Sequence, residues 1–120
     1  MKYLCLAYGD TSKMQALSRE DLHDIAEKCK PYDAELNHTK GLVFHEGLSG
    51  DVTTIRPRNG VVSVTDGPFV EVKEQVGGVF VIEAMDLNDA IRIASLHPAA
   101  HLGEDLGWGI EVRPIGAFRP

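Results

Sequence analysis

Two stretches of the chain, residues 2–8 and 79–85, are apolar at nearly every position. An unbroken apolar run of this length is typical of a strand buried on both faces, whereas a half-buried strand alternates apolar and polar residues. Less uniformly apolar runs at residues 42–48 and 110–115 predict two further strands. The pattern predicts a sheet in which strands 2–8 and 79–85 need apolar cover on both sides.

Two amphipathic helices are predicted between these strands. Ser18 is a suitable N-cap with Asp21 in the capping-box position, and an apolar stripe follows at Leu22, Ile25, Ala26 and Cys29. Pro31 interrupts the stripe, which resumes at Tyr32 and Leu36, so a kinked helix to about residue 40 is expected. Asp86 caps the second helix, and His97-Pro98 ends it. Residues 9–17 and 99–109 are expected to be loops.

A hairpin is predicted in the middle of the chain. Residues 52–56 and 60–65 are strand-like and flank Pro57-Arg58-Asn59-Gly60, and Asn-Gly between two such runs is a strong hairpin signal. The predicted order is therefore β-α-β, a hairpin, and β-α-β within a single domain of residues 1–120. This order predicts an α+β, ferredoxin-like fold with both helices on one face of the sheet.

Two helices can cover only one face of that sheet. Strands 2–8 and 79–85 are apolar on both faces, and a bare apolar face of several hundred Å² is not tolerated on a soluble monomer. A second copy of the chain is the simplest cover. The sequence therefore predicts a homodimer, a dimeric α+β barrel with its sheets packed face to face.

Charge and composition narrow the range of functions. The net charge is −6, and the 12 lysines and arginines are spread along the chain, so no direct binding to nucleic acid is expected. The apolar runs are too short to span a membrane, and the first run has no signal-peptide cleavage site, so we expect a cytoplasmic protein. Cys5 and Cys29 lack metal-ligand spacing and are interpreted as small core residues.

The segment Asp66-Gly67-Pro68-Phe69 is the main candidate for chemistry. In one interpretation Asp66 only ends a strand, accepting backbone N–H groups in an Asx-type turn. In the other, its carboxylate lies in a cleft beside Phe69 and acts in acid–base chemistry. We expect Asp66 to do both.

The histidines give weaker signals. His97 and His101 are four residues apart, but Pro98 breaks the helix that would align them for a metal. His97 at a helix C-terminus is more simply a capping cation. His23 and His38 lie off the apolar stripe, and His45 lies in a strand beside Glu46. No cofactor or metal is predicted, and a haem or metal protein is the weakest hypothesis.

Three segments carry a resemblance to a known family: residues 1–10 (MKYLCLAYGD), residues 64–100 (VTDGPFVEVKEQVGGVFVIEAMDLNDAIRIASLHPAA) and residues 110–115 (IEVRPI). Together they resemble the DGPF group of YCII-related proteins. The resemblance implies a ferredoxin-like fold that dimerises through its sheets and a bacterial, cytoplasmic origin. The wider family has a His–Asp pair near a cavity, and aligning on Gly41 places that pair near Lys30-Pro31 and Thr39, where neither residue type is kept.

The resulting hypothesis is a small dimeric protein with a cavity for an unknown small molecule, and the sequence does not decide whether it is an enzyme. Asp66 would be the acid, base or ligand anchor. The other predicted ligand contacts are Phe69 as an apolar wall, Lys73 and Glu74 near the mouth, and His97. The alternative is a non-catalytic partner of an extracytoplasmic-function sigma factor, because members of the DGPF group are encoded beside or fused to such factors.

Overall fold

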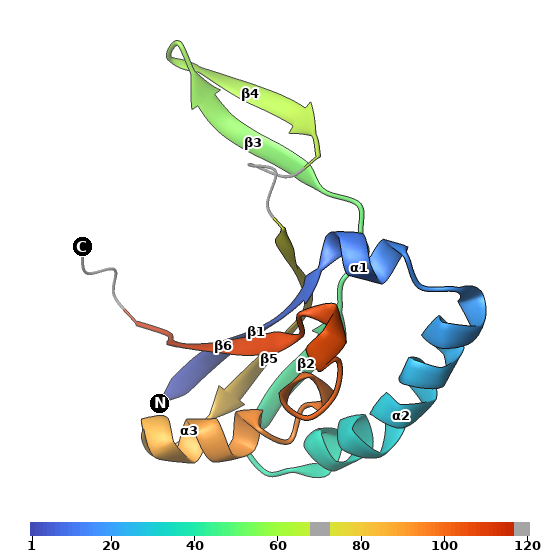
Figure 1. Cartoon of the computed structure of the whole chain (residues 1–120). Coiled ribbons are helices and arrows are strands. Elements are labelled where there is room, and N and C mark those ends of the chain that lie inside the picture. Colours follow the sequence, from blue (N-terminus) through green and yellow to red (C-terminus); the bar gives the residue numbers. More distant parts are fainter. Residues whose placement is uncertain (68–72, 117–120) are drawn as a thin grey trace.

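The computed structural model of the chain describes residues 1–67 and 73–116 (Figure 1). The strands are β1 (Lys2–Asp10), β2 (Leu42–Gly47), β3 (Thr53–Arg58), β4 (Val61–Asp66), β5 (Glu74–Glu83) and β6 (Gly109–Pro114). The helices are α1 (Thr11–Gln15), α2 (Arg19–His38) and α3 (Leu87–Ala94), with short 3-10 turns η1 (Pro98–Ala100) and η2 (Glu104–Leu106). The mixed α+β class with an antiparallel sheet is confirmed.

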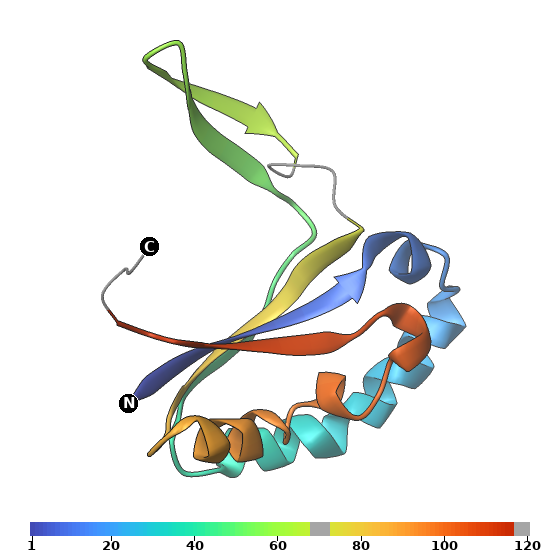
Figure 2. The ribbon, with the colours of Figure 1, turned by 60° about the vertical axis from the view of Figure 1, so that its left-hand side comes forward.

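Four strands form one antiparallel sheet in the order β2-β5-β1-β6. β5 lies between β2 and β1, and β1 lies between β5 and β6, so the two β-α-β units interleave. Helices α2 and α3 lie on the same side of this sheet, as Figure 2 shows. The two strands that are apolar on both faces are the two central strands, which is where the sequence pattern requires cover on both sides.

The core lies between the sheet and the helices. Tyr3 and Cys5 of β1 and Phe80 and Ile82 of β5 point to this side and are almost fully buried. Leu36 of α2 and three residues of α3 (Ala90, Ile93 and Ala94) complete the core on the helix side. The alternate residues of the same strands, which include the cross-strand pairs Leu4–Val81 and Leu6–Val79, form the face without helices.

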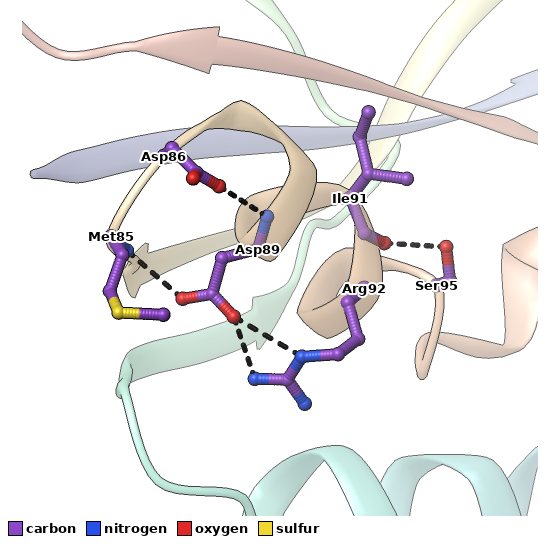
Figure 3. A network of polar contacts seen from close by, with 6 residues as sticks. All are labelled: Met85, Asp86, Asp89, Ile91, Arg92 and Ser95. Carbon is purple, nitrogen blue, oxygen red and sulfur yellow. Dashed lines mark hydrogen bonds and ion pairs between the residues drawn. The ribbon is translucent and has the colours of Figure 1, made fainter.

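The start of α3 is built as the sequence predicts. The Asp86 carboxylate accepts the Asp89 backbone N–H at 2.8 Å, which satisfies one of the free donors of the first turn. Figure 3 shows that Asp89 in turn accepts the Met85 backbone N–H and the Arg92 guanidinium. These bonds explain why the chain turns directly from β5 into α3.

The hairpin β3–β4 projects from the body of the molecule (Figure 1). Asn59 and Gly60 both have positive φ, 52° and 79°, as a two-residue type I′ turn requires. The hairpin is amphipathic, because the cross-strand pairs Ile55–Val64 and Pro57–Val62 share one face. That face is uncovered: Ile55, Val62 and Val64 are 67%, 74% and 61% exposed.

Two expectations about the N-terminal half are wrong. Residues 9–17 are not a loop, because β1 continues to Asp10 and the buried Asp10 side chain accepts the Lys13 N–H and starts α1. The stripe on α2 is not a buried face either. The helix runs through Pro31 without interruption, but Leu36 is its one fully buried residue, and Leu22 is exposed.

No helix in the described part of the chain is long and apolar enough to cross a membrane.

Candidate functional site

A hollow of about 250 Å³ lies between α2, η1 and the sheet, and we call it the cavity. It is lined by Ala7, Tyr8, Gly9, Met14, Cys29, Asp33, Gly47, Gly77, Gly78, His97, Pro98, Ala99 and Trp108. Small residues create the space, since Ala7 pairs with Gly78 and Gly78 pairs with Gly47 across three adjacent strands. In the neighbouring row, Cys5 pairs with Phe80 and Phe80 with His45; the Cys5 and Phe80 side chains belong to the core, and the His45 ring packs edge-on against Phe80.

Asp33 enters the cavity from α2, one helical turn after Cys29, which also lines it. Both side chains are half-buried. Burial raises the pKa of the Asp33 carboxyl above its ordinary value, and the nearby His45 partly opposes this rise. Burial, and then the Asp33 charge, raise the pKa of the Cys29 thiol. Asp33 is therefore a carboxyl group kept partly out of water at the wall of a hollow.

His97 lies opposite, between α3 and η1, and it is buried. Its Nδ1 accepts the Ala99 backbone N–H at 2.9 Å, which caps η1 and leaves the ring proton on Nε2. The ring stacks on Phe80 with 5.0 Å between centroids and 2° between planes. Burial, with a further contribution from His45, lowers the pKa of His97 from 6.5 to about 4. His97 is thus a neutral imidazole with a fixed N–H donor.

His45 of β2 completes a cluster that we call the Asp33–His45–His97 cluster. One ring nitrogen of each histidine and one carboxylate oxygen of Asp33 lie within 4.8 Å of one another. His45 Nδ1 lies 3.1 Å from the Asn37 Oδ1 and donates to it, which orients the ring. None of the three side chains is hydrogen-bonded directly to another in the described structure. Their separation leaves room for one bridging atom.

The spacing of this cluster also suits a metal ion, but the hydrogen bonds of the histidines do not. Asp33 can offer a lone pair, and so can His45 once Asn37 holds its Nδ1 proton. His97 cannot, because the Ala99 N–H occupies Nδ1 and the proton occupies Nε2. A metal would require an imidazolate at His97 or the loss of the η1 cap. The arrangement fits hydrogen bonding and proton transfer instead.

The single tryptophan of the chain forms another wall of the cavity. Trp108 Nε1 donates to the Met14 sulfur at 3.2 Å, which ties the wall to α1. Gly103 lies against the indole in the left-handed region, with φ +72°, and a Cβ there would come within 2.1 Å of the ring. The indole is therefore held from both sides.

The sequence-predicted site residues that the structure describes do not come together. Asp66 is exposed at the end of β4, where it lines a shallow hollow with Asp51 and Gln75, on the hairpin and not in the cavity. Lys73 lies 3.7 Å from the buried Asp10 carboxylate, and Glu74 is exposed at the start of β5. Phe69 lies outside the described residues. Among the predicted residues that the structure describes, His97 alone lines the cavity.

The role predicted for His97 as a capping cation is wrong. Its lowered pKa keeps the ring neutral, and it caps the following turn as an acceptor. The pair His97–His101 does not form a site either. His101 stacks on Tyr32 with 5.0 Å between centroids, away from the Asp33–His45–His97 cluster.

Asp33 and His45 were missed because neither belongs to a known motif. A usable signal was present in the pattern. Asp33 follows Cys29 by four residues on the helix stripe, and His45 alternates with Gly47 on the inward face of its strand. A titratable residue on a face that is otherwise apolar is an informative observation.

Comparisons with known proteins extend over the whole chain. The family model for the YCII-related domain matches residues 1–118. A curated relative from Rhizobium meliloti (strain 1021), named "Uncharacterized protein R00369", is 29% identical over 126 aligned residues. That alignment covers 100% of this chain and 96% of the relative. The similarity includes every element that lines the cavity.

Proposed function

The chain belongs to the YCII-related domain family, and from that premise we propose that it binds a small molecule in the cavity beside Asp33 and His97. One observation carries the proposal: an imidazole and a carboxyl group, both with pKa values shifted by burial, line the same hollow. Perturbed titratable groups in a mainly apolar hollow are typical of binding and catalytic sites. The cavity volume of about 250 Å³ fits a small metabolite.

Fluorescence of Trp108 is the direct test, because it is the only tryptophan and it lines the cavity. A panel of small uncharged, anionic and cationic compounds is titrated into the protein. Binding in the cavity should change the emission of Trp108 in a saturable way.

A cavity-blocking variant sharpens this test. Gly47 lines the cavity, and a Cβ there would meet nothing within 4 Å, so Gly47→Leu should fill the hollow without disturbing the sheet. Gly109→Leu is the matched control, since its Cβ is equally unobstructed and it lies outside the cavity. Titrations unaffected by Gly47→Leu would refute the cavity as the binding site.

We also propose the ferredoxin-like dimer that the sequence predicts, in the DGPF group that Asp66-Gly67-Pro68-Phe69 indicates. The face of the sheet opposite the helices supports it, because Leu4, Leu6, Val79 and Val81 lie together there. A second copy would cover this face. Light scattering should give twice 13.1 kDa, and a monomer at micromolar concentration would contradict the proposal.

A second candidate function is the non-catalytic partner of a sigma factor in the cytoplasm. The projecting hairpin favours a protein partner, because one face carries Ile55, Val62 and Val64 without cover. Val62→Lys should abolish co-purification with such a factor and leave ligand binding at the cavity unchanged. A Val62→Lys protein that still co-purifies would count against a role of the hairpin.

A further inference from the structure

The residues that line the cavity disfavour anionic ligands. Its lining in the described part of the chain contains an acid, Asp33, and an imidazole, His97, but no lysine or arginine. An anionic ligand would face the Asp33 carboxylate without a compensating cation, in surroundings where burial strengthens the repulsion. Besides the Tyr8 hydroxyl, the Cys29 thiol and the Trp108 N–H, which donates to Met14, the described side chains of the lining include the His97 N–H donor and the Asp33 carboxylate. This combination suits an uncharged molecule that carries a hydrogen-bond acceptor.

The N–H donor is held in place before any ligand arrives. The Ala99 N–H fixes the tautomer of His97, and the parallel stack on Phe80 fixes the ring plane. A neutral imidazole N–H can donate to a carbonyl oxygen and donates more strongly as negative charge develops on that oxygen. Because the donor does not need to reorient, it can stabilise an enolate at little cost in reorganisation.

The carboxylate is placed to act as the base. Asp33 belongs to the cluster whose ligand atoms lie within 4.8 Å of one another, and no direct hydrogen bond to His97 neutralises it. A raised pKa makes a carboxylate a better proton acceptor. A carbonyl oxygen and the hydrogen on the adjacent carbon are separated by only two carbon atoms. One small ligand can therefore place its oxygen at His97 and its C–H at Asp33.

We infer that the cavity takes a small uncharged carbonyl compound and moves a proton at the carbon next to the carbonyl group, with Asp33 as the base and His97 as the donor to the carbonyl oxygen. This inference rests on the proposed function, since it names the ligand class and reaction of the same cavity. It assigns a catalytic role to Asp33 and His97, each in contact with the reacting atoms.

The step balances without an oxidant or a cofactor. The Asp33 carboxylate takes the proton, and the electron pair of the broken C–H bond forms a carbon–carbon double bond. The π pair of the carbonyl moves onto oxygen, where the His97 Nε2–H stabilises it. Asp33 then returns the proton to the same carbon or, in an unsaturated compound, to the γ-carbon. The product is the exchanged carbonyl compound or its double-bond isomer.

The test measures exchange of carbon-bound hydrogen with deuterium oxide by proton NMR. The uncharged probes are cyclohexanone, butanone and α-angelica lactone, and the charged controls are cyclohexanecarboxylate and cyclohexylamine. Trp108 fluorescence determines which compounds bind. A bound uncharged probe should lose its α-hydrogen signals faster with the protein than in buffer.

Three variants assign the roles. Asp33→Asn keeps the side-chain shape and should lower the exchange rate about 100-fold, and His97→Gln should lower it by a similar factor. Asp24→Asn is the matched control: the same change on an exposed residue of the same helix should leave the rate unchanged. Circular dichroism melts establish that each variant is folded.

Each outcome separates the inference from the proposed function. If an uncharged probe changes Trp108 emission but exchanges no faster than in buffer, or as fast with Asp33→Asn, the inference is overturned and the binding function stands. If only the charged controls bind, the ligand class is wrong and the inference falls in the same way. If no compound of either set alters Trp108, the proposed function fails, and the inference fails with it.

Discussion

The cavity and the base of the hairpin each present an aspartate, and the surroundings of the two side chains differ. Asp33 is half-buried beside the His97 imidazole, which burial and then His45 hold neutral. Asp66 is exposed at the end of β4, at the base of the hairpin, where water solvates its charge. Partial desolvation and a fixed partner nearby shift the pKa of a carboxylate and make it suited to binding or catalysis. The conspicuous sequence motif and the desolvated acid are thus found in different regions.

The largest effect should come from a methyl group added beside Trp108. Gly103→Ala places a Cβ in the left-handed region and drives it into the indole, so we expect a loss of about 3 kcal/mol in the free energy of unfolding. Gly60→Ala, in the hairpin turn at φ +79°, has the same backbone strain with nothing within 4 Å, and should cost about 1 kcal/mol. Urea unfolding measures both. Equal losses in the free energy of unfolding would mean that contact with the indole adds nothing to the backbone strain at residue 103.

A smaller effect is expected from the titration of His97. Its folded-state pKa of about 4 lies below 6.5, so the unfolded chain binds the proton more readily as the pH falls. The stabilisation is complete above pH 6.5 and is lost as the pH falls towards 4. From pH 7 to pH 5 the chain should lose about 2 kcal/mol through this residue.

The raised pKa of Asp33 acts in the opposite direction, because the folded state then holds its proton more tightly. The contribution of His97 is therefore measured as the difference between the native chain and His97→Gln, by urea unfolding at both pH values. His23→Gln, at an exposed histidine of α2, is the control and should retain the native pH dependence. A His97→Gln protein with the native pH dependence would contradict the assigned cause.

The smallest effect is expected at the hairpin acid. Asp66→Asn should change the free energy of unfolding by no more than about 1 kcal/mol, because asparagine serves in Asx turns nearly as well as aspartate. The Trp108 titration should also be unchanged, since Asp66 does not line the cavity. A fall in ligand affinity with an unchanged melting curve would restore Asp66 as a functional residue and remove the contrast between the two acids.

Local rules predicted much of this fold. The caps at Ser18 and Asp86 and the Asn59-Gly60 turn each depend on a few adjacent residues, and each is found in the structure. The two apolar central strands were also identified. The class of the fold follows from the order of these elements.

The cavity could not be predicted in the same way. It depends on Ala7, Gly78 and Gly47 falling into one row across three strands, and therefore on strand register. The state of His97 depends on a hydrogen bond from Ala99 and on burial beneath α2, neither of which has a motif. The prediction that the apolar stripe of α2 is buried fails for a similar reason. The helix is amphipathic in sequence, but only Leu36 is fully buried in the core.

The order of the strands in the sheet has a consequence for biosynthesis. β1 lies at the centre of the sheet, yet both of its neighbours, β5 and β6, are synthesised much later, from Glu74 and Gly109 onward. An apolar strand must therefore wait unpaired while most of the chain is translated. Pairings between such distant segments form slowly, because a long loop must close before any contact compensates for its entropy. During this interval β1 is the segment of the nascent chain most in need of a chaperone.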